Sequence, residues 1–313
     1  MSNSTLSRVT HYPNFDWLRL LLAIQVVAIH CGIAPNVFMN PVPAFLAISG
    51  FVVLGSMERR PIGQFFVNRA LRVLPLLAVS FIAVGIFWSP QEMVRNILYW
   101  LWPTGDAPAN PVVWTLIYEE AFYATLAILF SLGVYKRRIV PIMICGFIMA
   151  MTIAFKFIML PKQWYMLGSA FFLGNVMYLF RDQIAEKLDR RIATALFIVS
   201  IAAVYWLPYN SIVRNPMAYI DFISFAAMIA FAIAGPKLPR LKIDMSYSLY
   251  LTHYLVLAQL IYFVPLGQRL FWFVLLSSLP ICYMAWYVIE KPALSLKVKF
   301  FSEAKGVALT KEV

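Results

Sequence analysis

Charged side chains are scarce in this chain. Asp, Glu, Lys and Arg make up 13% of its 313 residues, whereas a soluble globular domain usually carries about 25%. Hydrophobic residues reach 62% and aromatic residues 16%, so too few polar side chains remain to cover a water-exposed surface. This composition excludes a soluble enzyme, a disordered chain and a nucleic-acid-binding domain. It indicates a polytopic membrane protein.

Cysteine and histidine are also few, with three of each. Cys31, Cys145 and Cys282 lie in or beside apolar stretches and show neither metal-site spacing nor a disulfide framework, so we expect no bound metal. Residues 1–16 are polar and lack the apolar centre of a cleaved signal peptide. We therefore expect a cytoplasmic N-terminal segment at 1–16, followed by a first membrane helix that is retained.

Long apolar runs, in contrast, are abundant. A helix that crosses a hydrocarbon core of about 30 Å needs about 20 mostly apolar residues. We expect ten such helices, at 17–33, 42–57, 73–89, 113–133, 139–159, 165–180, 192–208, 217–234, 246–264 and 270–289. The predicted fold is an all-α membrane bundle, with a transmembrane domain at 17–292 and a cytoplasmic tail at 293–313.

The distribution of basic side chains favours this topology. With the N-terminus in the cytoplasm, 20 of the 26 Lys and Arg residues fall on the cytoplasmic side and four on the outer side, while Arg19 and Lys156 fall within helices. Such asymmetry follows the positive-inside rule. We therefore expect both termini in the cytoplasm and a location in the inner or plasma membrane of a bacterium. The net charge of +12 then reflects topology and anionic lipid, not a nucleic-acid partner.

Ionisable side chains inside a bilayer are costly and by default indicate function. Arg19 and His30 are 11 residues apart in the first expected helix. This spacing places them about 16 Å apart along the axis and roughly on one face. Glu119 and Glu120 open the fourth expected helix at a similar depth, and we expect Glu119 to face inward and orient His30. The alternatives are that Arg19 snorkels to the interface and that His30 only bonds a neighbouring helix.

Further polar groups accompany these residues. Arg69 and Arg72, at i and i+3 near the cytoplasmic start of the third expected helix, could bind phosphate, or could simply anchor the helix. Side chains that could support the site, as oxyanion donors or by packing, are Ser49, Trp114, Tyr123, Tyr247, Ser248 and His253. Trp100, Trp102 and Asp106 in the outer connection could bind a sugar, although interfacial tryptophans often only anchor a protein.

These segments, in this order, resemble the acyltransferase-3 family of integral membrane O-acyltransferases over about residues 15–292. The matching motifs are Arg19 with His30, Phe45–Phe51, Arg69 with Arg72, Trp114–Tyr123 with Thr115 in place of a serine, Ser246–His253, and Glu290-Lys291-Pro292. The resemblance implies transfer of an acyl group, often acetyl, from acyl-CoA to a hydroxyl of a glycan. It implies acyl-CoA as co-substrate and no permanently bound cofactor.

Both arguments predict one mechanism. Acyl-CoA enters from the cytoplasm, Arg19, Arg69 and Arg72 bind it, and its thioester reaches His30. This histidine acts as general base or carries the acyl group transiently. The expected partners are acyl-CoA, the bilayer and an extracytoplasmic or lipid-linked glycan, for example an exopolysaccharide or a lipopolysaccharide. The alternative functions are a secondary transporter or flippase of a polar or glycan-type substrate, or a membrane scaffold or sensor. The two halves lack the paired repeats common in transporters.

Overall fold

The computed structural model describes residues 11–33, 39–103, 105–153, 162–206 and 214–296. Within these ranges the chain is all-helical and without strands, as the sequence predicts. Most of the two expected cytoplasmic segments, 1–10 and 297–313, lies outside the described residues, as does Lys156.

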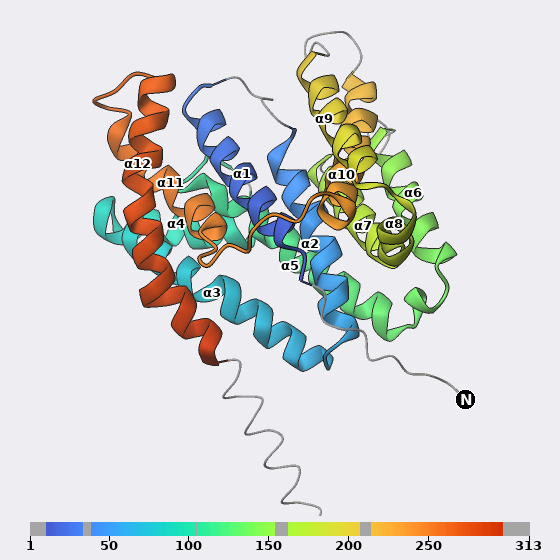
Figure 1. Ribbon diagram of the computed structural model, residues 1–313. Helices are drawn as coiled ribbons and strands as arrows, with labels where there is room; N and C mark the ends of the chain where they lie inside the picture. The colour runs from blue at the N-terminus through green and yellow to red at the C-terminus, as the bar shows by residue number, and fades with distance from the viewer. Residues whose placement is uncertain (1–10, 34–38, 104, 154–161, 207–213, 297–313) are drawn as a thin grey trace, which may run out of the picture.

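Twelve α-helices and three short helical turns make up the described part of the chain (Figure 1). The helices are α1 (Pro13–His30), α2 (Pro41–Glu58), α3 (Ile62–Phe87), α4 (Pro90–Leu101), α5 (Trp114–Ser131), α6 (Ile139–Ile153), α7 (Lys162–Leu179), α8 (Arg181–Lys187), α9 (Arg190–Trp206), α10 (Arg214–Ala234), α11 (Ser246–Leu260) and α12 (Gln268–Ala285). The turns are η1 (Pro111–Val113), η2 (Val134–Lys136) and the π-helical η4 (Trp286–Glu290). Each of the ten predicted spans overlaps one α-helix, whereas α4 and α8 lie in segments that the hydrophobic pattern assigns to loops.

Four segments of the described chain are long and apolar enough to cross a membrane: Pro41–Glu58, Ile62–Phe87, Pro111–Ser131 and Gln268–Leu296. They correspond to α2, α3, η1 with α5, and α12 with the residues that follow it. Their length and composition support a membrane protein. The ten-span topology, the cytoplasmic termini and the inner-membrane location stay predictions.

α2 packs closely against α7 within the larger hydrophobic core. The close approach requires glycine, because a Cβ at Gly50 would lie 2.0 Å from the carbonyl oxygen of Phe171. A Cβ at Gly174 would lie 2.1 Å from that of Ala47. Small residues at a helix crossing are typical of membrane helices. The tight contact holds α2, and with it the neighbouring Ser49, in a defined position.

α11 packs against both α1 and α12 in a second core. Figure 1 shows α11 and α12 on one side of α1 and α2, and α7, α9 and α10 on the other. The two groups of helices therefore meet at α1 and α2, where the predicted site residues Arg19, His30 and Ser49 lie.

A buried asparagine attaches the segment between α10 and α11 to the start of α1. The amide nitrogen of Asn14 donates to the carbonyl of Pro236 at 3.0 Å, and its amide oxygen accepts from the backbone N–H of Leu238 at 2.9 Å. The indole of Trp17 donates to the carbonyl of Pro239 at 2.7 Å. These bonds fix the first half of the segment beside α1, and Asp244 follows five residues after Pro239.

Candidate active site

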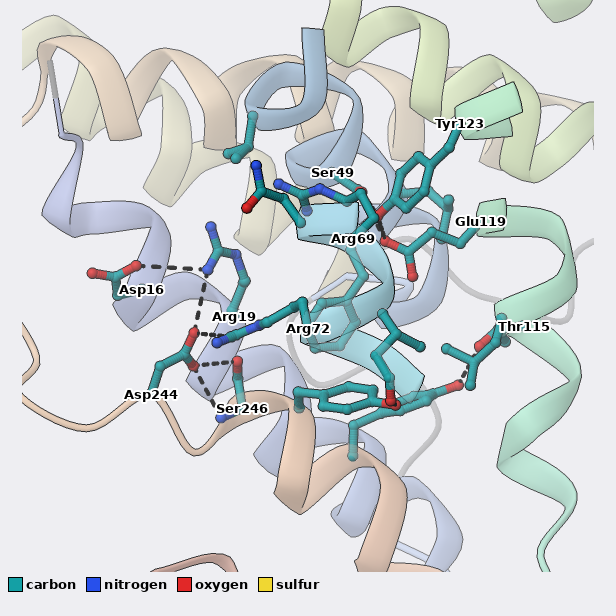
Figure 2. Close-up of a pocket in the computed structure, with 18 of the residues that line it drawn as sticks. Asp16, Arg19, Ser49, Arg69, Arg72, Thr115, Glu119, Tyr123, Asp244 and Ser246 are labelled. Carbon is teal, nitrogen blue, oxygen red and sulfur yellow. Dashed lines mark hydrogen bonds and ion pairs between the residues drawn. The ribbon is translucent and has the colours of Figure 1, made fainter. Parts of the chain in front are cut away.

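A cavity of about 390 Å³ lies where α1, α2, α3, α5 and the start of α11 meet. Figure 2 shows two groups of polar side chains around it. One group contains Arg19, Arg72 and Asp244, and the other contains Ser49, Arg69, Glu119 and Tyr123. These two groups thus bring together six of the predicted site residues and Asp244, which no prediction assigns to the site.

Asp244 connects the two arginines of the first group (Figure 2). Its Oδ2 accepts a hydrogen bond from Arg72 and lies 3.5 Å from Nη1 of Arg19. Its Oδ1 accepts from the backbone N–H of Ser246 at 3.2 Å and from the Ser246 hydroxyl at 2.6 Å. Asp16 lies 3.6 Å from the same Nη1 of Arg19. One carboxylate therefore links α1, α3 and the start of α11, while each guanidinium keeps further N–H groups free to donate.

The charge balance of this group is set by Asp244. Burial raises the pKa of Asp244, but the charges of Arg72 and Arg19 and the two hydrogen bonds from Ser246 outweigh that effect and leave the pKa well below its usual value. Asp244 is therefore ionised at neutral pH. Glu290, from η4, is buried and lies 3.9 Å from the other side of the Arg72 guanidinium. Arg72 is thus held between two carboxylates.

The second group is a cluster of two hydroxyls and a carboxylate. Ser49 Oγ donates to Oε1 of Glu119 at 2.8 Å and lies 2.8 Å from the hydroxyl of Tyr123, which also donates to that Oε1. Glu119 and Tyr123 are four residues apart on α5 and therefore share one face. The guanidinium carbon of Arg69 lies 5.7 Å from the centre of the Tyr123 ring.

His30 has a different partner from the one expected. Its Nδ1 lies 2.8 Å from Nε2 of His253, and the two ring planes differ by only 12°. Nδ1 of His253 lies 2.9 Å from the carbonyl oxygen of Leu249. Glu119, by contrast, bonds Ser49 and Tyr123, so the expected bond between Glu119 and His30 is absent from the described contacts. Depth counting places both groups at a similar level but cannot give the rotation of each helix about its axis.

The contacts of the histidine pair determine its protons. A carbonyl oxygen can only accept, so Nδ1 of His253 carries a hydrogen. In the neutral ring, Nε2 of His253 is then an acceptor, and Nδ1 of His30 donates to it. Nε2 of a neutral His30 is consequently left with its lone pair free. The pair can therefore act as an oriented base.

The histidine pair is separate from the cavity. Neither His30 nor His253 is among the residues that line it, whereas Tyr250 is, and the Tyr250 ring centre lies 6.4 Å from that of His253. The Tyr250 hydroxyl bonds the hydroxyl of Thr115 at 2.7 Å and donates to the carbonyl of Val112 at 3.0 Å. Tyr250 thus stands between the two polar centres.

Of the three remaining predicted supporting residues, one lines the cavity and two do not. Tyr247 lines the cavity and donates to the carbonyl of Val73 at 2.9 Å. Ser248 donates to the carbonyl of Met245 at 3.1 Å and is fully buried, and Trp114 packs edge-on against Tyr118. Neither Ser248 nor Trp114 lines the cavity, so their contacts are those of packing residues.

The predicted acceptor residues of the outer connection do not form one surface. Trp100 packs against Phe81 in a core, with ring centres 6.0 Å apart. Trp102 directly follows α4 and is 73% exposed, and Asp106 is also exposed. Trp102 and Asp106 are therefore open to a sugar, whereas Trp100 is partly buried. Acceptor binding by this connection stays a prediction.

Comparisons with known proteins match most of the chain. The family model of the acyltransferase-3 domain matches residues 12–288. A curated relative, "Nodulation protein 10" from Rhizobium leguminosarum bv. viciae, is 26% identical over an alignment that covers 95% of this chain and 97% of the relative. No solved structure matches the chain.

Proposed function

Because the chain belongs to the acyltransferase-3 family, we propose that this membrane acyltransferase moves an acyl group, preferentially acetyl, from cytoplasmic acyl-CoA to a glycan hydroxyl. The acceptor in this proposal is an extracytoplasmic or lipid-linked glycan, and acyl-CoA is a co-substrate. The observation that carries the proposal is the cavity itself, which holds three arginines beside a cluster of hydroxyls and a carboxylate, next to a histidine pair.

Donor binding is assigned to the arginines. Arg19 and Arg72 already have carboxylate partners in Asp16, Asp244 and Glu290. Among the described residues, Arg69 has no ion pair, so its guanidinium can bind a phosphate without first leaving a carboxylate. We therefore assign to Arg69 the strongest contact with the phosphates of acyl-CoA, and to Arg19 and Arg72 the contacts that their remaining N–H groups can make.

Chemistry is assigned to His30. Its Nε2 removes the proton from the acceptor hydroxyl, the hydroxyl oxygen attacks the thioester carbonyl carbon, and the carbon–sulfur bond breaks. The coenzyme A thiolate then takes the proton. In the second route, Nε2 attacks the thioester carbonyl carbon and the coenzyme A thiolate leaves. The acceptor hydroxyl then attacks the acyl carbon, the bond to Nε2 breaks, and the hydroxyl proton goes to the thiolate. Either route requires the acyl end to pass Tyr250, because this residue stands between the cavity and the histidines.

Purified protein in lipid nanodiscs with acetyl-CoA labelled in the acetyl group tests the proposal. The label should appear on glycan extracted from the membranes, and surface glycans of cells that lack the protein should lose the corresponding acetyl groups by mass spectrometry. A transporter or flippase would move its substrate without incorporating label. If acetyl-CoA neither binds nor yields labelled acceptor, the assignment of acyl-CoA as donor is wrong.

A further inference from the structure

We propose that Asn68, together with Nε of Arg69, binds a carbonyl oxygen of the acyl donor inside the cavity. This inference rests on the proposed function, and it adds a substrate-binding residue that none of the motifs contains. Asn68 precedes the arginine pair on α3 and lines the cavity with Arg69.

The amide of Asn68 is buried without a partner. The residue is 3% exposed, and its Nδ2 has no hydrogen-bond partner in the described structure. Nε of Arg69 is likewise buried and without a partner. Buried polar groups are normally paired, because an unpaired one loses its bonds to water without replacement. Two consecutive residues line the cavity, and each has a buried donor without a partner, which indicates that a bound molecule completes them.

The other buried asparagines of the described structure show how unusual this is. Asn14, Asn96, Asn110 and Asn175 each donate from Nδ2 to a backbone carbonyl, at distances of 2.9 to 3.3 Å. Through these bonds Asn14, Asn110 and Asn175 connect two parts of the fold, and the Asn96 amide does so through its oxygen, which accepts from the backbone N–H of Asn110. Asn68 makes no such connection, which separates its role from theirs.

The two unpaired groups, Nδ2 of Asn68 and Nε of Arg69, determine which kind of atom the ligand must provide. Both orphaned groups are N–H donors, so the ligand must offer an acceptor. Around them, Glu119 already accepts from Ser49 and Tyr123. The terminal nitrogens of Arg69 can hold a phosphate, whereas its Nε and the neutral amide of Asn68 suit an uncharged oxygen. Acyl-CoA carries such oxygens in the pantetheine amides and in the thioester.

The test replaces Asn68 with a side chain of similar size that cannot donate. Asn68→Leu should weaken acetyl-CoA binding about tenfold, because the ligand oxygen would face an apolar group. The same change should leave the melting temperature unchanged or raise it, because it removes a buried unpaired amide. Binding is measured by titration of the full chain in nanodiscs, and stability by thermal unfolding.

Asn175→Leu is the matched control. Asn175 is as buried as Asn68, but its amide nitrogen bonds the carbonyls of Gly50 and Phe171, and its oxygen accepts from Tyr135. Its replacement should lower the melting temperature by several degrees and leave the affinity of the folded fraction for acetyl-CoA unchanged. The two variants should therefore respond in opposite ways.

Three probes identify the bound oxygen. Equal loss of affinity for acetyl-CoA and free coenzyme A assigns Asn68 to a pantetheine amide, and loss confined to acetyl-CoA assigns it to the thioester. An equal loss for adenosine 3′-phosphate 5′-diphosphate, which has no carbonyl, would contradict the inference.

Two results distinguish this inference from the proposed function. Wild-type affinity of Asn68→Leu for acetyl-CoA would overturn the role of Asn68 and leave the acyltransferase assignment standing. Absence of acetyl-CoA binding by the wild-type chain would overturn both. If the leucine variant does not fold, Asn68→Ala is measured instead, and a stable alanine variant with unchanged affinity overturns the inference equally.

Discussion

The cavity and the histidine pair are two polar centres of one bundle. The cavity contains charged side chains, whereas both rings of the pair can be neutral. In the cavity, charges are present and several are paired, as Arg72 is with Asp244 and Glu290, whereas Arg69 has no ion pair among the described residues. At the pair, His253 is fully buried, and the hydrogen bonds end at a backbone carbonyl, so both rings can stay neutral. The difference follows from the cost of burying charge, which is smallest when a charged group is paired or a titratable ring stays neutral. It suggests that binding and chemistry are divided between the two centres.

Replacement of His30 should have the largest effect, and this effect should be on acyl transfer and not on acetyl-CoA binding. His30→Ala removes the free Nε2, so we expect acyl transfer to fall by about 10²- to 10⁴-fold or more. Acetyl-CoA affinity should be retained, because His30 does not line the cavity. Transfer of labelled acetyl and acetyl-CoA titration on the same preparation measure the two quantities. A well-inserted variant with wild-type turnover would exclude His30 from the chemistry.

Replacement of Arg72 should chiefly affect the stability of the cavity. Arg72→Ala leaves Asp244 and Glu290 without their shared counter-charge, so we expect a loss of about 3 kcal/mol of unfolding free energy. Arg69→Ala, the control on the same face of α3, should weaken acetyl-CoA binding by about tenfold or more with little change in melting temperature. The double variant Arg72→Ala, Asp244→Asn should regain part of the lost stability. Equal melting temperatures for Arg72→Ala and Arg69→Ala would contradict the expectation that an ion-paired arginine contributes more to stability than an unpaired one.

His253 should act only through His30. His253→Ala removes the acceptor that orients His30, and we expect kcat to fall about ten- to a hundredfold, as when the second hydrogen bond of a metal-ligating histidine is lost. KM for acetyl-CoA should stay unchanged, since His253 does not line the cavity. His253→Gln should recover part of kcat, because the glutamine amide oxygen can accept near the position of Nε2. An unimproved glutamine variant that folds normally would show that His253 does not orient His30 in this way.

The smallest effect is expected at the outer connection. Trp102 is exposed, so Trp102→Ala should change neither melting temperature nor acetyl-CoA affinity. If the acceptor stacks on this ring, KM for the acceptor should rise about fivefold, equivalent to about 1 kcal/mol. Trp100→Ala is the contrasting variant, because Trp100 packs against Phe81 and its loss should lower stability. An unchanged acceptor KM for Trp102→Ala would leave this tryptophan with an anchoring role.

Several features of the site were predictable because they depend on spacing within one helix. The i, i+3 spacing of Arg69 and Arg72 and the i, i+4 spacing of Glu119 and Tyr123 place each pair on one face whatever the helix packs against. The cavity contains all four. Ser89 and Pro90, a serine N-cap followed by proline, also mark the start of α4, although the hydrophobic pattern assigns this segment to a loop.

Other features were not predictable, because they join residues far apart in the chain. His30 and His253 are 223 residues apart, and Arg72 and Asp244 are 172 apart. Asp244 carried no functional signal, since an acidic residue just before a helix is already favoured by the helix dipole. The expected contact between Glu119 and His30 rests only on their similar depth in the membrane. In the structure, Glu119 accepts a hydrogen bond from Ser49 instead.

The amino-acid sequence by itself determined the class of molecule, the approximate positions of ten of its twelve described α-helices and the family to which it belongs. Composition, the length of apolar runs and local motifs depend only on residues that are close in the sequence. They are therefore the same however the helices pack. Only the tertiary structure decided which imidazole orients His30, which carboxylate holds Arg72 and which buried amide remains unpaired. Those outcomes depend on how each helix is rotated about its axis, and that rotation is set by contacts such as the glycine crossing of α2 and α7.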